Sequence, residues 1–147
     1  MASEMRSKLA AAYAEWHESR GTTPQHFFAL MAEDILVHSI LENSFGSEPL
    51  GRRFSGRSEV ISYYALLAES WEMVSASTEA ILVEGNRAVW IGKACWRSRK
   101  TLRQIDSPKV DVWTFTDDGL ATELFEMYDS YPYAVLTGQV SPAGASG

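Results

Sequence analysis

The chain has 147 residues, of which 46% are hydrophobic and 22% charged, a composition that fits one globular domain with a substantial core. Its formal net charge of −6 argues against partners that need a basic surface, such as nucleic acid or an anionic membrane. The single Cys95 excludes an internal disulfide and a cysteine-based zinc site, and the histidines lack zinc-ligand spacing, so we expect no metal and no cofactor. No apolar run approaches the roughly 18 residues that cross a bilayer, and we expect the protein in the cytoplasm.

Helical periodicity marks three segments in the first half of the chain: residues 3–20, 24–32 and 58–71. Gly21 is placed to end the first helix, and Thr23 with Pro24 to begin the second. A strand over residues 34–38 and a loop over residues 43–56, with one short strand at most, are expected between the second and third helices.

Four long strands are predicted in the second half: residues 73–84, 88–99, 109–116 and 120–131. Gly85-Asn86 and Asp117-Asp118-Gly119 supply turns between them. Helices followed by a meander of antiparallel strands are typical of an α+β fold. We therefore expect one α+β domain over residues 1–138, in which N-terminal helices close off a pocket in a curved antiparallel sheet. Residues 139–147 are small and polar enough to form a flexible tail.

Aromatic residues make up 12% of the chain, with five Trp, six Tyr and six Phe. Rings this abundant either fill a core or line a concave binding site. Composition alone leaves both interpretations open.

Three stretches carry a family resemblance. The first runs from Phe28 through Glu33-Asp34 to His38, the second is Phe54-Ser-Gly56-Arg57 followed by Tyr63-Tyr64, and the third is Asp118-Gly119-Leu120 leading to Glu126-Met127-Tyr128-Asp129. In this order and spacing they resemble the nuclear-transport-factor-2-like superfamily, and within it the SnoaL-like and ketosteroid-isomerase-like proteins, over most of residues 5–138.

The resemblance implies a cone-shaped, curved sheet wrapped around the N-terminal helices, often with homodimers formed through the outer face of the sheet. It does not fix one reaction, because the superfamily includes isomerases, dehydratases, cyclases, epoxide hydrolases and non-catalytic binding modules. Trp90 or Trp96 would be a natural dimer contact if either lies on the outer face.

Asp111 is the first candidate for chemistry in the pocket. Strand alternation places it on one face with Trp113 and Phe115, and an acid among aromatic rings should have a raised pKa. In ketosteroid isomerase a neutral aspartic acid donates a hydrogen bond to a developing oxyanion beside a tyrosine. Asp111 resembles that acid and Tyr13 that tyrosine. The alternatives are that Asp111 pairs with Lys93 or Lys109 to fix strand register, and that Tyr13 is a core residue.

The resemblance leaves the general base open. The isomerase has a carboxylate at the end of its first strand, where this chain has Ser39, and serine is not a useful base. His38 is next to it and titrates near neutral pH, which suits a base. Alternation places His38 on the face opposite Val37 and Ser39, so it is also expected as an outer-face or interface residue.

Two further groups come from a comparison with limonene-epoxide-hydrolase-like members. Their closing aromatic-Asp motif is matched by Asp129, but Cys95 stands where their second acid should be, so hydrolysis by that triad is not expected. Lys93 keeps the basic position and would face Asp111 if the hairpin centres near Leu102, where a desolvated lysine can act as base or nucleophile. Alternatively, Asp129 only caps the strand end and Lys93 only reaches solvent.

Two functions follow from these candidates. The first is a cofactor-independent acid/base enzyme, an isomerase, dehydratase, cyclase or related lyase, acting on a small and largely apolar carbonyl compound. The second is a non-catalytic module that binds a hydrophobic small molecule or partner segment. The candidate catalytic residues are Tyr13, His38, Lys93, Asp111 and Asp129. The residues expected to line the pocket are Trp16, Val37, Ser39, Tyr64, Trp113, Phe115 and Met127.

Overall fold

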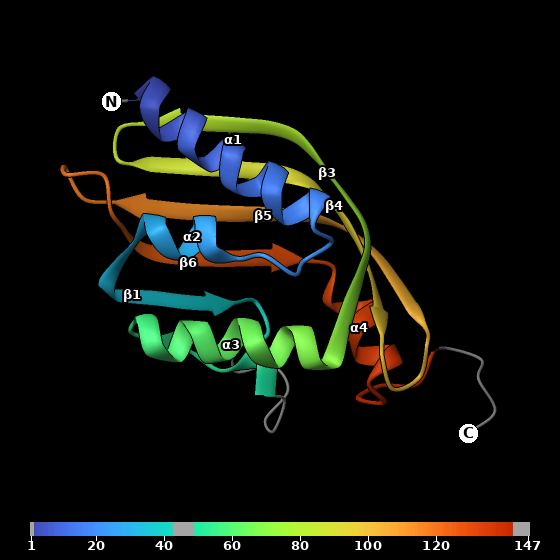
Figure 1. Ribbon diagram of the computed structural model, residues 1–147. Coiled ribbons are helices and arrows are strands. Elements are labelled where there is room, and N and C mark those ends of the chain that lie inside the picture. Colours follow the sequence, from blue (N-terminus) through green and yellow to red (C-terminus); the bar gives the residue numbers. More distant parts are fainter. Residues whose placement is uncertain (1, 43–48, 143–147) are drawn as a thin grey trace.

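The computed structural model describes residues 2–42 and 49–142, and it has the expected order of helices followed by strands (Figure 1). The elements are α1 (Ala2–Glu18), α2 (Gln25–Leu30), β1 (Met31–Ser39), a 3-10 turn (Pro49–Gly51), β2 (Phe54–Ser55), α3 (Arg57–Ser70), β3 (Trp71–Glu84), β4 (Arg87–Ser98), β5 (Gln104–Phe115), β6 (Ala121–Tyr128) and α4 (Ser130–Leu136). Much of the predicted loop over 43–56 and the last five residues of the predicted tail lie outside the described residues. No helix within the described ranges is long and apolar enough to cross a membrane.

The strands form one curved sheet with the order β2-β1-β6-β5-β4-β3. Helices α1, α2 and α3 lie over one face of it, and α4 lies near the end at which β6 stops (Figure 1). The predicted α+β fold is confirmed, with one correction. The sheet is mixed rather than antiparallel, because β1 runs parallel to β6. These strands lie far apart in the chain, so no hairpin turn forces them to run in opposite directions.

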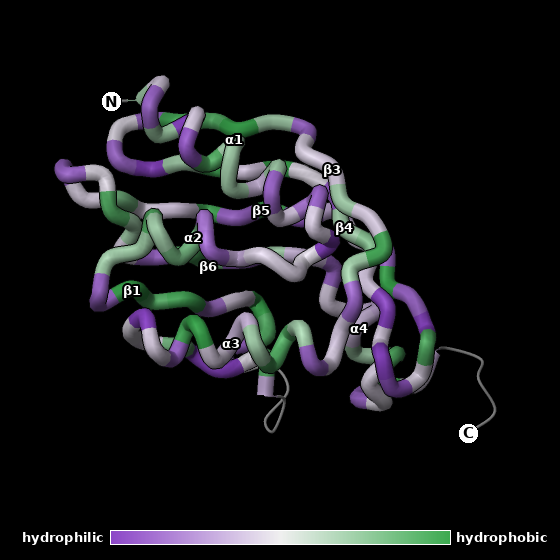
Figure 2. Tube along the Cα trace, viewed as in Figure 1, coloured by the Kyte–Doolittle hydropathy of each residue, from purple (hydrophilic) through white to green (hydrophobic). Residues whose placement is uncertain are grey.

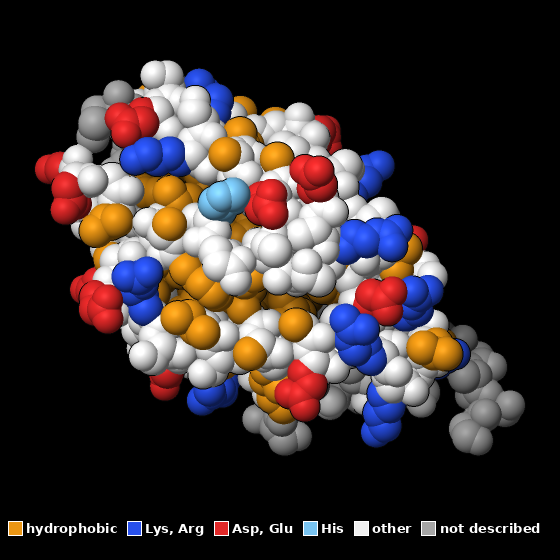
Figure 3. Space-filling view, viewed as in Figure 1, with side chains coloured by type: hydrophobic (Ala, Val, Ile, Leu, Met, Phe, Trp, Pro, Cys, Tyr) orange, Lys and Arg blue, Asp and Glu red, His pale blue; other side chains and the backbone are white. Residues whose placement is uncertain are grey.

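The core lies between the sheet and the helices. Helix α1 buries Leu9, Tyr13 and Trp16, which are on the face that the helical spacing predicts. Strand β1 is hydrophobic along most of its length (Figure 2), and helix α3 packs against it. On the helix side of the molecule, hydrophobic side chains gather toward the middle and charged ones lie mainly around the edge (Figure 3).

The β4–β5 hairpin fixes which residues face the helices. It pairs Trp90 with Asp111 and Lys93 with Pro108. The predicted pairing of Lys93 with Asp111 is therefore wrong. The actual partner of Lys93, Pro108, comes three residues before Asp111 in the chain. An odd shift moves a side chain to the opposite face of the sheet. Leu102, which was expected at the centre of the hairpin, lies near the β5 end of the connecting loop, where it has a left-handed φ of 62°.

The last predicted strand is too long. Strand β6 ends at Tyr128, and Asp129 then accepts a hydrogen bond from the Tyr131 backbone N–H, 3.1 Å away, as the N-cap of α4. Pro132 lies in the first turn of that helix, where a missing N–H costs little. Helix α4 was not predicted, because its apolar residues also fit a continuing strand.

Candidate active site

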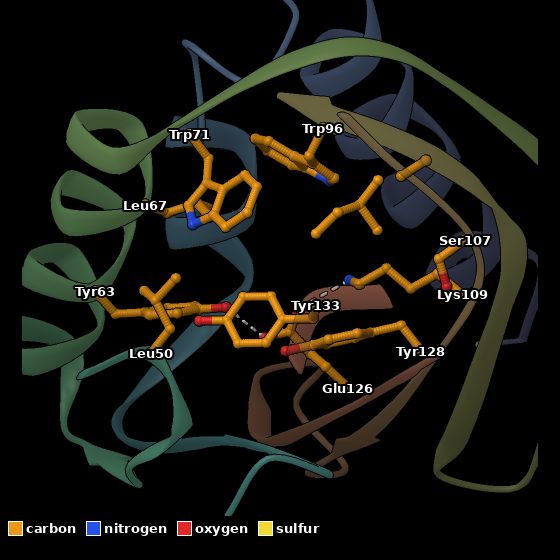
Figure 4. A pocket seen from close by; sticks show the side chains of 12 residues that line it. Leu50, Tyr63, Leu67, Trp71, Trp96, Ser107, Lys109, Glu126, Tyr128 and Tyr133 are labelled. Atoms are coloured by element: carbon orange, nitrogen blue, oxygen red, sulfur yellow. Dashed lines mark hydrogen bonds and ion pairs between the residues drawn. The ribbon is translucent and has the colours of Figure 1, made fainter. Parts of the chain in front are cut away.

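Two adjacent hollows lie between the sheet and the helices. The inner chamber has a volume of about 40 Å³ and is lined by residues that include Tyr13, Tyr64, Trp90, Asp111 and Trp113. The outer chamber has a volume of about 100 Å³ and mostly apolar walls (Figure 4). Both are lined by Tyr63, Leu67, Ala94, Trp96, Lys109 and Glu126.

The border between the chambers carries a buried charged cluster of Lys109, Asp111 and Glu126. The Lys109 ammonium lies 2.8 Å from Asp111 Oδ1 and 2.8 Å from Glu126 Oε2. Tyr13 Oη donates to Asp111 Oδ2 over 2.5 Å, and Tyr63 Oη donates to Glu126 Oε1 over 3.0 Å. One lysine thus joins two carboxylates, and each carboxylate also accepts from a tyrosine.

Sheet register assembles this cluster. Asp111 of β5 lies directly opposite Glu126 of β6, and Lys109 is two residues before Asp111 on the same face. Opposed acids would repel one another. The lysine ammonium between them compensates this repulsion, so the pair can be buried (Figure 4).

Burial and mutual charge shift the pKa values in the cluster. Burial raises the pKa of Asp111 and the charge of Glu126 adds to this, while Lys109 opposes it. Burial disfavours the charged form of Lys109, but the two carboxylates outweigh burial and raise its pKa. Burial, followed by the neighbouring carboxylate, also holds the pKa values of Tyr13 and Tyr63 well above their ordinary range.

Tyr13 is held rigidly. Its ring stacks on Trp90 with centroids 4.5 Å apart and planes 5° from parallel, and Trp113 Nε1 donates to its hydroxyl over 3.0 Å. Trp90 in turn lies over Gly92, where an added Cβ would collide with the indole. The Tyr13 hydroxyl therefore already accepts from Trp113 and donates to Asp111.

Five of the predicted site residues come together in the inner chamber: Tyr13, Trp16, Tyr64, Asp111 and Trp113. In this geometry Asp111 accepts hydrogen bonds from Lys109 and Tyr13, whereas the sequence comparison expected a neutral acid that donates one.

The other residues predicted to line the pocket do not line either chamber. Val37 and Ser39 are buried, and Ser39 Oγ accepts from the Leu41 backbone N–H over 3.1 Å. Phe115 is a core residue that also lines a separate hollow beside the start of α1. Met127 lies on the opposite face of β6 from Glu126, because neighbouring residues of a strand alternate.

Lys93, His38 and Asp129 are not at the cluster. Lys93 is exposed, because its pairing with Pro108 places it on the face of the sheet opposite Asp111. Asp129 is exposed and caps α4. His38 lies on the outer face, where Nδ1 is 2.8 Å from Glu42 and Nε2 is 2.8 Å from Glu123. Trp90 and Trp96 line the inner chamber, so the suggestion that they form an outer-face contact is also wrong.

Glu126 and Tyr63 were not identified as site residues from the sequence, and Lys109 was considered only as a structural partner. Alternation contains a signal for two of them. The step of two residues that groups Asp111 with Trp113 also reaches Lys109, and Leu124, Glu126 and Tyr128 form the same kind of series in β6. An acid between apolar residues on a core-facing row is the feature that marks Glu126.

The cluster can hold and move a proton. It combines a carboxylate with a raised pKa, a second carboxylate, and a permanently charged ammonium beside an apolar hollow. Such groups are those of general acid/base chemistry and of oxyanion stabilisation. Among the described residues, no group of three or more His, Cys, Asp or Glu side chains is placed to hold a metal ion.

Comparisons with known proteins agree with this architecture. The family model described as a SnoaL-like domain matches residues 9–124. No curated protein matches the chain. Similar solved structures include a protein of the nuclear transport factor 2-like class from Burkholderia pseudomallei, with a TM-score of 0.76 and 20% identity over 90% of this chain and 95% of that one.

Two further structures have names that indicate chemistry. A proposed isomerase from Rhodopseudomonas palustris has a TM-score of 0.71 and 12% identity over 92% of this chain and 97% of that one. A proposed SnoaL-like polyketide cyclase from Jannaschia has a TM-score of 0.66 and 17% identity over 92% of this chain and 94% of that one. At these identities the likeness is one of fold.

Proposed function

The chain belongs to the SnoaL-like domain family, and we propose that it is a cofactor-independent acid/base enzyme. Its substrate would be a small, largely apolar carbonyl compound that enters through the outer chamber. The observation that carries the proposal is the Lys109 ammonium held 2.8 Å from both Asp111 and Glu126 beside an apolar hollow. Buried ion pairs of this kind often give less stability than well-packed apolar residues would, which supports a role for them in function.

In the proposed reaction Asp111 takes a proton from the carbon next to the substrate carbonyl. The electron pair of that C–H bond forms a C=C bond, and the carbonyl oxygen becomes an enolate oxygen that Lys109 stabilises. Return of the proton to a different carbon gives an isomer. Glu126, which borders both chambers, is the second group that can carry the proton in this step. Loss of a β-hydroxyl group as water gives dehydration, and attack of the enolate carbon on a second carbonyl gives cyclisation.

The names of two similar structures, a proposed isomerase and a proposed SnoaL-like polyketide cyclase, support this class of reaction, because isomerisation and cyclisation are two of its outcomes. The outer chamber would also suit a non-catalytic module, because its apolar walls can bind a hydrophobic ligand whether or not a reaction follows. The two functions differ in whether a bound carbonyl compound loses a proton.

Deuterium exchange tests this difference. The protein is incubated in D₂O with a cyclic ketone such as cyclohexanone, and loss of the proton next to the carbonyl is followed by NMR. We expect Asp111→Asn to slow exchange at least about 100-fold, the usual effect of removing a general base, and Glu126→Gln to slow it less. Asp34→Asn and Glu79→Gln change exposed acids away from the site and are the matched controls. Ligand binding without exchange would favour the binding module.

The proposal keeps two expectations from the sequence, a homodimer through the outer sheet face and a location in the cytoplasm. Half-buried apolar residues on that face, such as Ile91, Val112 and Phe125, support the dimer. Light scattering of the wild type and of Ile91→Arg tests it, because a charge in an apolar interface should yield monomers. Fractionation of the source cells tests the location.

A further inference from the structure

Three tyrosines line the inner chamber, and two of them already have protein partners for their hydroxyls. Tyr13 donates to Asp111 and Tyr63 donates to Glu126. Tyr64 lines the inner chamber and is 8% exposed, yet its hydroxyl makes no hydrogen bond with any residue that the structure describes. Of the three tyrosines that line the inner chamber, Tyr64 is therefore the donor that remains available to a ligand.

The Tyr64 hydroxyl opens onto the chamber. Every fully enclosed polar side-chain atom in the described parts of the chain has a partner, so a hydroxyl without one must reach a surface. Tyr64 lines the inner chamber together with Lys109, Asp111 and Glu126, and the charges of these three residues act on its hydroxyl. Burial first, and then the charge of Glu126, hold the pKa of Tyr64 well above its ordinary range, so it keeps its proton and remains a donor at neutral pH.

The Tyr64 ring is positioned before any ligand arrives. It contacts Trp16 edge-on with centroids 5.4 Å apart, and Phe28 edge-on at 5.3 Å. Tyr63, its neighbour in α3, contacts it at 5.3 Å. A donor fixed by aromatic contacts on several sides needs little reorganisation when charge develops on a nearby oxygen.

We propose that Tyr64 donates the hydrogen bond that holds the substrate carbonyl oxygen and its enolate in the inner chamber. This inference rests on the proposed function and names the residue that recognises the substrate oxygen. As Asp111 removes the proton from carbon, negative charge grows on oxygen, and the Tyr64 O–H and the Lys109 ammonium both stabilise it. Tyr13 does not take this part, because its hydroxyl proton is already given to Asp111.

Binding of 4-nitrophenol tests the assignment. Its ring is small, its oxygen imitates an enolate oxygen, and its phenolate is coloured, so absorbance reports both binding and ionisation. We expect the wild type to bind it, and Tyr64→Phe, which keeps the ring but loses the hydroxyl, to bind at least about tenfold more weakly. Tyr131→Phe makes the same chemical change at an exposed position of α4 and should bind like the wild type.

The outcomes separate the two proposals. Equal affinity of the wild type and Tyr64→Phe would overturn the role of Tyr64 and leave the proposed function standing. A wild-type protein that neither binds 4-nitrophenol nor exchanges a ketone proton would overturn both proposals. If Tyr64→Phe does not fold, proton NMR of the wild-type complex decides instead. A downfield hydroxyl proton with a nuclear Overhauser effect to the Tyr64 ring supports the assignment, and its absence contradicts it.

Discussion

Asp111 and Glu126 lie opposite each other on neighbouring strands, and the same Lys109 ammonium is 2.8 Å from a carboxylate oxygen of each. Two acids and one base in a space without bulk water cannot all keep their ordinary proton affinities. The pKa of Asp111 is raised for this reason.

The activity should rise with pH through a range above that of an ordinary aspartate. Only the carboxylate form of Asp111 can accept a proton. Because burial raises the pKa of Asp111, this form appears only at a higher pH than for an ordinary aspartate. Because Lys109 lowers the pKa of Asp111, Lys109→Met should move the acid limb to still higher pH. Exchange rates measured from pH 4 to 9 for both proteins check this. An acid limb that stays in place, or that moves to lower pH, would show that Asp111 is not the base.

Lys109→Met should also destabilise the protein at neutral pH. It leaves buried carboxylates without their cation, and loss of one partner from a buried ion pair costs about 3–5 kcal/mol. The pKa of Asp111 in the folded variant would rise further above its unfolded value, so the missing stability should return as the pH falls below that raised pKa. Urea unfolding at pH 7 and pH 5 measures both effects. Lys93→Met, at an exposed lysine, is the control, and an equal loss in both variants would contradict the prediction.

Gly92→Ala should damage the site indirectly. The added methyl group collides with the Trp90 indole and the Ser77 carbonyl, and such overpacking costs about 1–3 kcal/mol. Trp90 stacks on Tyr13, so the Tyr13 bond to Asp111 should be disturbed as well. We expect a lower free energy of unfolding together with slower ketone exchange. Gly119→Ala adds a methyl group in open space at a strained φ of 85°, so it should cost stability while leaving exchange unchanged.

His38→Leu should affect stability and spare catalysis. The change removes contacts to Glu42 and Glu123 on the outer face, away from both chambers. We expect the Tm to fall by roughly 2–4 °C, the scale of one or two lost hydrogen bonds in a chain of this length. Exchange rates at 25 °C should match the wild type, and a large loss of activity in the folded variant would restore His38 as a candidate base.

Periodicity was sufficient to predict the first three helices, the existence of the long strands, and the shared face of Asp111 and Trp113. It was not sufficient for the β4–β5 register, because the left-handed turn at Leu102 has no glycine or asparagine to mark it. Lys93 was therefore assigned to the wrong face. Alternation groups Glu126 with Leu124 and Tyr128, but the other row of β6, with Phe125 and Met127, is also apolar. Which of the two rows faces the core depends on how β6 pairs with β5, which is a long-range property.

The sequence separation of 98 positions between Tyr13 and Asp111 has a consequence for folding. Lys109 and Glu126 are only 17 residues apart and meet as soon as the β5–β6 hairpin closes, whereas Tyr13 must arrive across nearly the whole chain. Longer loops cost more entropy to close, so local pairing precedes the docking of α1. Until α1 docks, Asp111 lacks the Tyr13 hydrogen bond and is open to water. Tryptophan fluorescence, to which Trp90 contributes and which its stacking on Tyr13 alters, should therefore change in the same late kinetic phase in which the site becomes able to bind ligand.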